Sequence, residues 1–151
     1  MKYNVVAFLV EFESESEKEK REVEVRTRLI DLIKHALSEI GVYKMTGEEL
    51  CRAVKNRCAY LLGLNPELGK FVKHIVVYKG IEAKSFSDAE VKVNSLPPVA
   101  GWTGREGLVV KYAFPYVEDI IDPPTNKTDY LPCLIPFALL FLLKSHESQP
   151  R

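Results

Sequence analysis

The chain has 151 residues, of which 46% are hydrophobic and 28% are charged. This length and apolar content can bury one sizeable core and predict a single domain over residues 1–151, with residues 145–151 as a short flexible tail. Its 21 basic and 21 acidic residues cancel, so net charge alone predicts neither nucleic acid nor an acidic partner unless the charges are segregated. The dominance of Lys, Glu and Arg over Gln is typical of hyperthermophile proteins and predicts a microbe from a hot environment.

The N-terminal half combines one strand with amphipathic helices. Residues 2–13 carry apolar side chains on both faces, which predicts a central strand covered on both sides. Ser16 and Glu19 have capping-box spacing and predict the start of a helix that ends before residue 41. A second amphipathic helix is expected over residues 46–63, and residues 65–67 (Asn-Pro-Glu) open a third helix.

The second half is richer in strand signals. We expect a strand over residues 74–78, because β-branched side chains dominate there although apolar residues at helical spacing run into it. Gly80 is expected to turn the chain into a strand over residues 81–86, and residues 89–93 to supply another strand of an antiparallel meander. Residues 108–114 return to a strand pattern after a loop rich in glycine and proline.

An almost uniformly apolar segment, residues 131–143, lies near the C-terminus. It is shorter than a membrane span and contains two prolines, so we expect no membrane helix. Its helix should start near Pro136 and be deeply buried, because none of its faces is polar. Any part that the chain does not cover, with Phe137, Leu140 and Phe141, should meet a second copy or a protein partner.

The cysteine count fits an intracellular protein. Cys51, Cys58 and Cys133 are too few, and odd in number, for a secreted disulfide framework. The chain begins without the basic and then apolar pattern of a signal peptide, which predicts a cytoplasmic location. Cys51 and Cys58 lie about 10 Å apart along an expected helix, so only one of them can form a disulfide, with Cys133. The alternative is three buried thiols that pack as small apolar side chains.

Charge is segregated along the chain. A single acid accompanies six basic residues between positions 50 and 79: Arg52, Lys55, Arg57, Lys70, Lys73 and Lys79. Residues 11–24 instead hold seven glutamates and three basic residues. With Tyr60, Phe71 and Tyr78 nearby, the basic stretch predicts contacts with phosphates and stacking on bases. The alternative is an ordinary solvated helix surface, on which Glu48 pairs with Arg52 one turn later.

Glu82-Ala83-Lys84 resembles the E-x-K strand motif of restriction-type nucleases. The resemblance implies that Glu82 binds a divalent metal and that Lys84 stabilises the attacking water or the developing charge. Such a site needs a further carboxylate, and the nearby upstream candidate, Glu67, falls on an expected helix. The alternative is an exposed strand with Glu82 and Lys84 turned outward.

One loop has the composition of a ligand-binding segment. Trp102 and Arg105 lie among glycines, and such a loop can clamp an anion or a flat ligand. The alternative is a tryptophan that folds back over the edge of the core. The three histidines are scattered, no spacing of His or Cys resembles a zinc site, and no cofactor motif is found.

Together these features predict an α+β fold, with a mixed or mainly antiparallel sheet of about four or five strands, amphipathic helices and a buried apolar C-terminal helix. The functional interpretation that fits best is a non-catalytic subunit or homo-oligomer, part of a nucleic-acid-handling assembly through the basic stretch. The alternative is a metal-dependent nuclease that uses Glu82 and Lys84.

Overall fold

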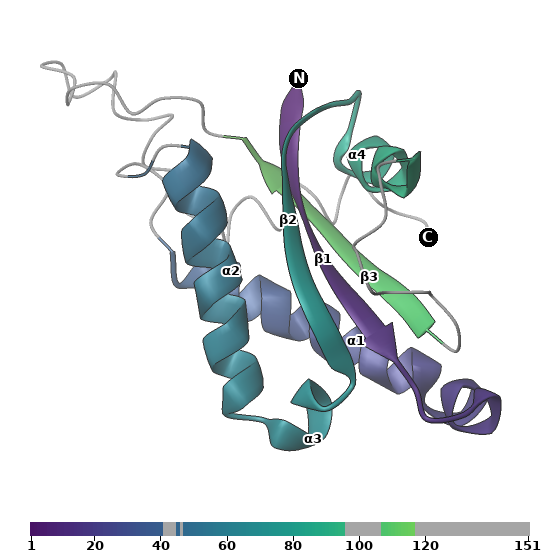
Figure 1. The fold of residues 1–151 in the computed structure, drawn as a ribbon. Coiled ribbons are helices and arrows are strands. Elements are labelled where there is room, and N and C mark those ends of the chain that lie inside the picture. The colour runs from purple at the N-terminus through teal and green to yellow at the C-terminus, as the bar shows by residue number, and fades with distance from the viewer. Residues whose placement is uncertain (41–44, 46, 96–106, 117–151) are drawn as a thin grey trace, which may run out of the picture.

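The structure is a computed structural model, which describes residues 1–40, 45, 47–95 and 107–116. A three-stranded antiparallel sheet lies at its centre, in the order β2-β1-β3 (Figure 1). The strands are β1 (Lys2–Glu11), β2 (Val72–Glu82) and β3 (Gly107–Pro115). The α+β class and antiparallel pairing agree with the sequence, whereas the described residues form three strands and not four or five.

Strand β1 is the middle strand, as its two apolar faces predict. Val6, Phe8 and Val10 point to one face of the sheet and belong to the larger of two hydrophobic clusters. Tyr3 and Val5 belong to the smaller cluster on the opposite face. A strand with neighbours on both sides and cover on both faces has no position for a charged side chain in its interior, which explains its uninterrupted run of buried residues.

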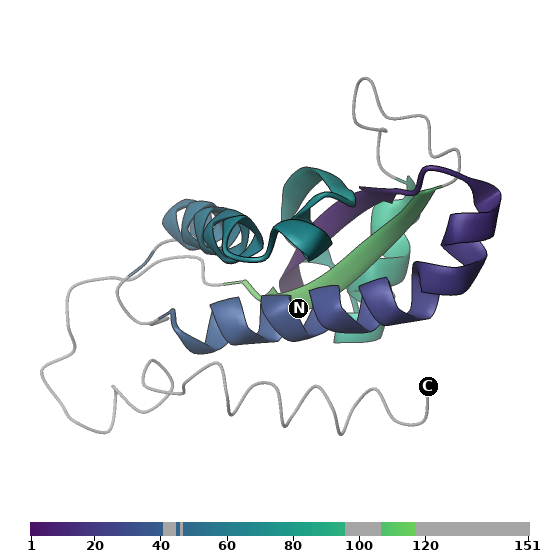
Figure 2. The same ribbon diagram turned by 90° about the horizontal axis from the view of Figure 1, so that it is seen from below.

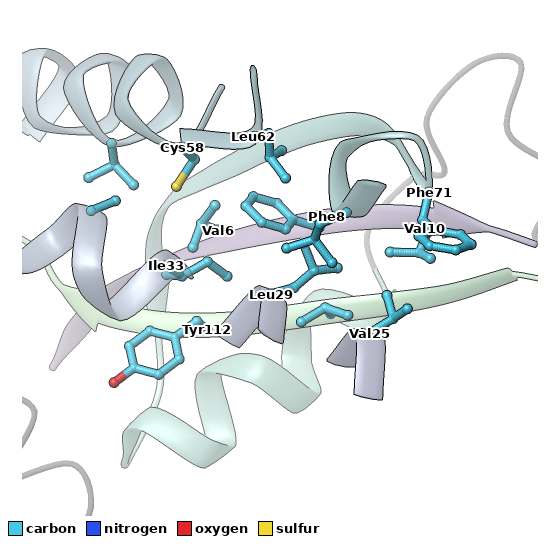
Figure 3. Packing of buried hydrophobic residues seen from close by; sticks show 14 of the residues in the cluster. Val6, Phe8, Val10, Val25, Leu29, Ile33, Cys58, Leu62, Phe71 and Tyr112 are labelled. Atoms are coloured by element: carbon cyan, nitrogen blue, oxygen red, sulfur yellow. The ribbon is translucent and has the colours of Figure 1, made fainter. Parts of the chain in front are cut away.

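Two helices cover the first face. Helix α1 (Glu15–Ser38) passes along the sheet in Figure 2 and buries a stripe at helical spacing that includes Leu29 and Ile33. Helix α2 (Gly47–Gly63) packs beside β2 and contributes Cys58 and Leu62 to the same cluster (Figure 3). The N-cap of α1 is Ser14, whose hydroxyl oxygen accepts a hydrogen bond from the backbone of Glu17, and not the predicted Ser16.

The short helix α3 (Pro66–Gly69) joins α2 to β2. Asn65 caps it, with its side chain accepting a hydrogen bond from the backbone of Leu68, and Pro66 occupies the first turn. This arrangement confirms the prediction of a short helix followed by a strand.

The strands expected over residues 81–86 and 89–93 are wrong. Strand β2 continues through Gly80, whose φ of 70° lies at an irregularity in the pairing and not at a reversal of the chain. Helix α4 (Phe86–Lys92) and a 3₁₀ turn (Val93–Ser95) follow it. The Ser85 hydroxyl accepts from the backbone of Asp88 and starts the helix. Helical spacing then places Phe86, Ala89 and Val93 against the second face of the sheet.

Several predicted features lie outside the described residues. They are the apolar segment 131–143 with its interface residues Phe137, Leu140 and Phe141, the tail 145–151, the loop with Trp102 and Arg105, and Cys133. They stay predictions. Among the helices that the structure describes, none is long and apolar enough to cross a membrane.

Candidate nucleic-acid interface

Helix α2 and strand β2 lie side by side (Figure 1). Residues of both elements line two open recesses. The first, of about 600 Å³, runs from the C-terminal half of α2 past α3 to the start of β2. The second, of about 490 Å³, continues toward the N-terminus of α2 and the far end of β2. Lys55 and Ile75 line both recesses, so the two form one continuous feature, which we call the basic groove.

Five of the six basic residues singled out in the sequence line this groove. Arg52 and Lys55 come from α2, Lys70 from the turn after α3, and Lys73 and Lys79 from β2. Residues as far apart in the sequence as Arg52 and Lys79 thus contribute charge to one surface. Among the described residues that line the groove, Glu48 is the one acid.

The sixth basic residue, Arg57, is not part of the groove. Its guanidinium group forms an ion pair with Glu39 at the end of α1, and its central carbon lies 4.8 Å from the centroid of the Tyr60 ring. Arg57 lies five positions after Arg52 on α2, so it faces away from β2. It therefore joins the two helices and does not add to the charge of the groove.

The groove cations are only partly neutralised. Lys79 Nζ lies 3.6 Å from a carboxylate oxygen of Glu48, and both side chains are exposed, so this pair is weak. Lys73 Nζ donates to the carbonyl of Lys70 at 3.2 Å, which holds the ammonium in place without cancelling its charge. Arg52 and Lys55 form no ion pair with any residue that the structure describes. The groove thus keeps a positive surplus.

Local packing explains why these side chains gather. The buried stripe of α2, which includes Val54 and Cys58, faces the core and leaves positions 52 and 55 on the flank toward β2. On the strand, Lys73 lies at one irregularity of the β1–β2 pairing and Lys79 at the other. A β-bulge breaks the regular alternation and redirects a side chain. Both lysines therefore lie where the pleat is interrupted.

The aromatic residues of the sequence hypothesis, Tyr60, Phe71 and Tyr78, do not line the groove. Phe71 is buried in the core with its ring centroid 5.4 Å from that of Phe12, and Tyr78 packs against the cluster on the opposite face. Tyr60 is 55% exposed but is not among the residues lining the groove. In the described part of the chain, the floor is aliphatic and includes Ile75 and Val77. Among the described residues, the lining thus offers charge for phosphates but no Phe, Tyr or Trp ring for base stacking.

Two further groove residues were missed in the sequence. His74 is exposed and lines the first recess, because it follows Lys73 on an edge strand. Cys51 lines the second recess, where burial raises the pKa of its thiol to about 11, with Lys79 lowering it and Glu48 raising it. Burial thus disfavours the thiolate form of Cys51 that nucleophilic chemistry needs. Within the part of the chain that the structure describes, neither Cys51 nor Cys58 forms a disulfide.

The E-x-K residues lie at the end of β2, beyond the residues that line the groove. A carboxylate oxygen of Glu82, on a side chain that is 69% exposed, lies 3.6 Å from the N-terminal amino group. The backbone amide of Lys84 donates to Asp88 at 2.9 Å, which lowers the pKa of that carboxyl. Within the described residues, no group of three His, Cys, Asp or Glu side chains could hold a metal ion. The nuclease hypothesis stays a prediction without support from this geometry.

No family model, curated protein sequence or solved structure matches the chain. We therefore argue function from the groove itself.

Proposed function

We propose that this protein is a non-catalytic, nucleic-acid-binding subunit of a larger assembly and that the basic groove holds the phosphate backbone. The observation that supports the proposal is the convergence of five basic side chains, from a helix, a turn and a strand, on one surface with a single acid. The same number of cations scattered over the molecule would attract a polyanion weakly, whereas a row of them can neutralise successive phosphates.

The groove favours contacts with the backbone over contacts with bases. The planar side chains among its described lining residues are those of Arg52 and His74, whereas five cations are available for phosphates. Backbone contacts carry no sequence information, so we expect binding that depends on salt and hardly on sequence. If all five cations meet phosphates, the slope of log K against log salt is about −3.5 for a single strand and about −4.5 for a duplex.

The test compares two double variants with the same loss of charge. Lys55→Gln with Lys73→Gln removes two cations of the groove. Lys20→Gln with Lys84→Gln removes two exposed lysines elsewhere. Fluorescence anisotropy with labelled 20-nucleotide DNA and RNA, single-stranded and duplex, gives the affinity at several salt concentrations. We expect the groove variant to bind more weakly, with a salt slope lower in magnitude by about 1.4 to 1.8, and the control to match the wild type.

Two results would overturn the proposal. The first is a wild-type protein that binds none of the four probes at low salt. The second is an equal loss of affinity in the groove and control variants, because a general field effect would then explain the binding. Thermal unfolding of each variant, followed by circular dichroism, checks that the substituted proteins are folded at the assay temperature.

A further inference from the structure

Strand β2 has one open edge in the part of the chain that the structure describes. It pairs with β1 on one side, and no other described strand or loop forms backbone hydrogen bonds with its second side. Along such an edge, alternate residues present backbone N–H and C=O groups outward, about 7 Å apart. Strand β2 extends over 11 residues, which is long for an edge with which no further described strand pairs.

The basic groove runs along this open edge. Ile75, Val76 and Val77 all line the second recess, and residues 72–75 all line the first. Side chains of successive residues in a strand point to opposite faces of the sheet. Consecutive residues can therefore border one recess only if that recess follows the edge of the strand. A ligand in the groove meets the outward backbone groups of β2 as well as its lysines.

The regular part of the edge is short and has a lysine at each end. Residues 74–78 pair with β1 without interruption, and the register shifts lie just outside this run. Lys73 and Lys79 flank it. Five residues of strand are about 17 Å long. This length suits an added strand of five or six residues with charges at its ends.

The flanking charges decide which strand fits. A second copy of β2, added antiparallel about Val76, would place Lys73 of each chain opposite Lys79 of the other, and like charges directly opposite are destabilising. An acidic strand instead meets Lys73 and Lys79 on β2 and Arg52 and Lys55 across the groove. From this geometry we propose that the open edge of β2 accepts an extended acidic segment of a partner protein by strand addition.

This interaction goes beyond nucleic-acid binding and does not depend on it. A peptide strand both donates to and accepts from the edge, whereas a phosphate group can only accept from its N–H groups, and the lysines select acidic sequences. Because both ligands cover the same cations, the acidic segment and nucleic acid compete for the groove. A partner carrying such a segment would release nucleic acid from the protein.

The experiment uses a fluorescent eight-residue peptide that alternates Glu and Val, titrated into the full chain at low salt. Three controls are matched to it: the same peptide with Lys in place of Glu, and two versions N-methylated at alternate residues in opposite frames. Only the amides of one frame can face β2. We expect the Lys peptide not to bind, and N-methylation in one frame to weaken binding at least tenfold more than in the other.

Hydrogen exchange by NMR locates the bound peptide. We expect the outward-facing amides of residues 74–78 to become protected when the Glu peptide is added. An oligonucleotide that binds the groove should displace the peptide and reverse this protection. Equal affinity for all three Glu peptides would overturn strand addition in favour of simple charge attraction. If these amides become protected without peptide as the protein concentration rises, a second copy of the chain occupies the edge, and this result would also overturn the proposal. If the Glu peptide does not bind although oligonucleotides do, this inference is refuted and the proposed function stands.

Discussion

Replacing Asn4 with alanine tests how the sheet that supports the groove is held together. Asn4 is fully buried in β1, and its side chain reaches both neighbouring strands. Its Oδ1 accepts from the backbone N–H of Gly80 at 3.2 Å, and its Nδ2 donates to the carbonyl of Pro115 at 3.5 Å. An unsatisfied buried polar group costs about 1–3 kcal/mol, and the longer of these two bonds is the weaker. We expect Asn4→Ala to lower the free energy of unfolding by about 2 kcal/mol.

The measurement is urea unfolding followed by far-UV circular dichroism. The midpoint should fall without a change in the m-value, because the folded state keeps its compactness. In a chain of this size, the loss corresponds to a Tm lower by about 4–8 °C. Asn56→Ala, at an exposed position of α2, is the matched control and should change stability by less than about 0.5 kcal/mol. If Asn4→Ala is as stable as this control, the hydrogen bonds of Asn4 to Gly80 and Pro115 contribute nothing to the free energy of unfolding.

Three further predictions concern single groups. Gly80→Ala should lower the free energy of unfolding by about 1–2 kcal/mol, because φ at this position is 70°. Gly63→Ala is the control: an added Cβ meets nothing within 4 Å, so the same urea assay should give an unfolding free energy that is equal or up to about 1 kcal/mol higher. Ser14→Ala should lower the free energy of unfolding by about 1 kcal/mol through loss of the N-cap of α1, and Ser16→Ala should leave it unchanged. The opposite result would show that Ser16 caps the helix, as the sequence predicts. Burial raises the pKa of the Cys58 thiol from 9.0 to about 12, so its contribution to stability is full below pH 9 and lost between pH 9 and 12, as the unfolded thiol ionises first. Cys58→Val should reduce the alkaline decline of the unfolding free energy measured at pH 8, 10 and 11, and leave the part that Cys51 and Tyr112 contribute through their own raised pKa values; an unchanged decline would contradict the assignment.

Much of the fold follows from local pattern. The apolar faces of β1 and the helical spacing in α1 and α2 are set by residues within each segment, so the sequence is sufficient to place them. Helix α4 had a local signal too. Ser85 and Asp88 have N-cap spacing, yet β-branched residues at positions 91 and 93 favour a strand over so short a stretch. Packing of Phe86 and Ala89 on the second face decides between the two.

Other features depend on partners distant in sequence. From its neighbours alone, Gly80 is compatible with a turn or with a bulge, because an isolated glycine between two strand-like stretches fits either. Its backbone instead bonds to Asn4, 76 positions away, and the strand runs on. No window of local sequence contains that contact. The end of β2, and hence the number of strands, was therefore beyond prediction from periodicity.

The groove shows the same division between composition and geometry. Counting charges identified the basic stretch, but not that Glu39 removes Arg57 from it or that Phe71 is in the core. Lys73 and Lys79 reach the groove because β2 is held in register by buried side chains, among them Phe8 opposite Ile75. A slip of one residue would turn every side chain of the strand to the other face. Core substitutions that keep this register should therefore weaken binding only in proportion to the unfolded fraction, whereas charge substitutions should weaken it at constant stability. Affinity and unfolding free energy measured on both sets of variants would separate a groove that binds from one that is merely well packed.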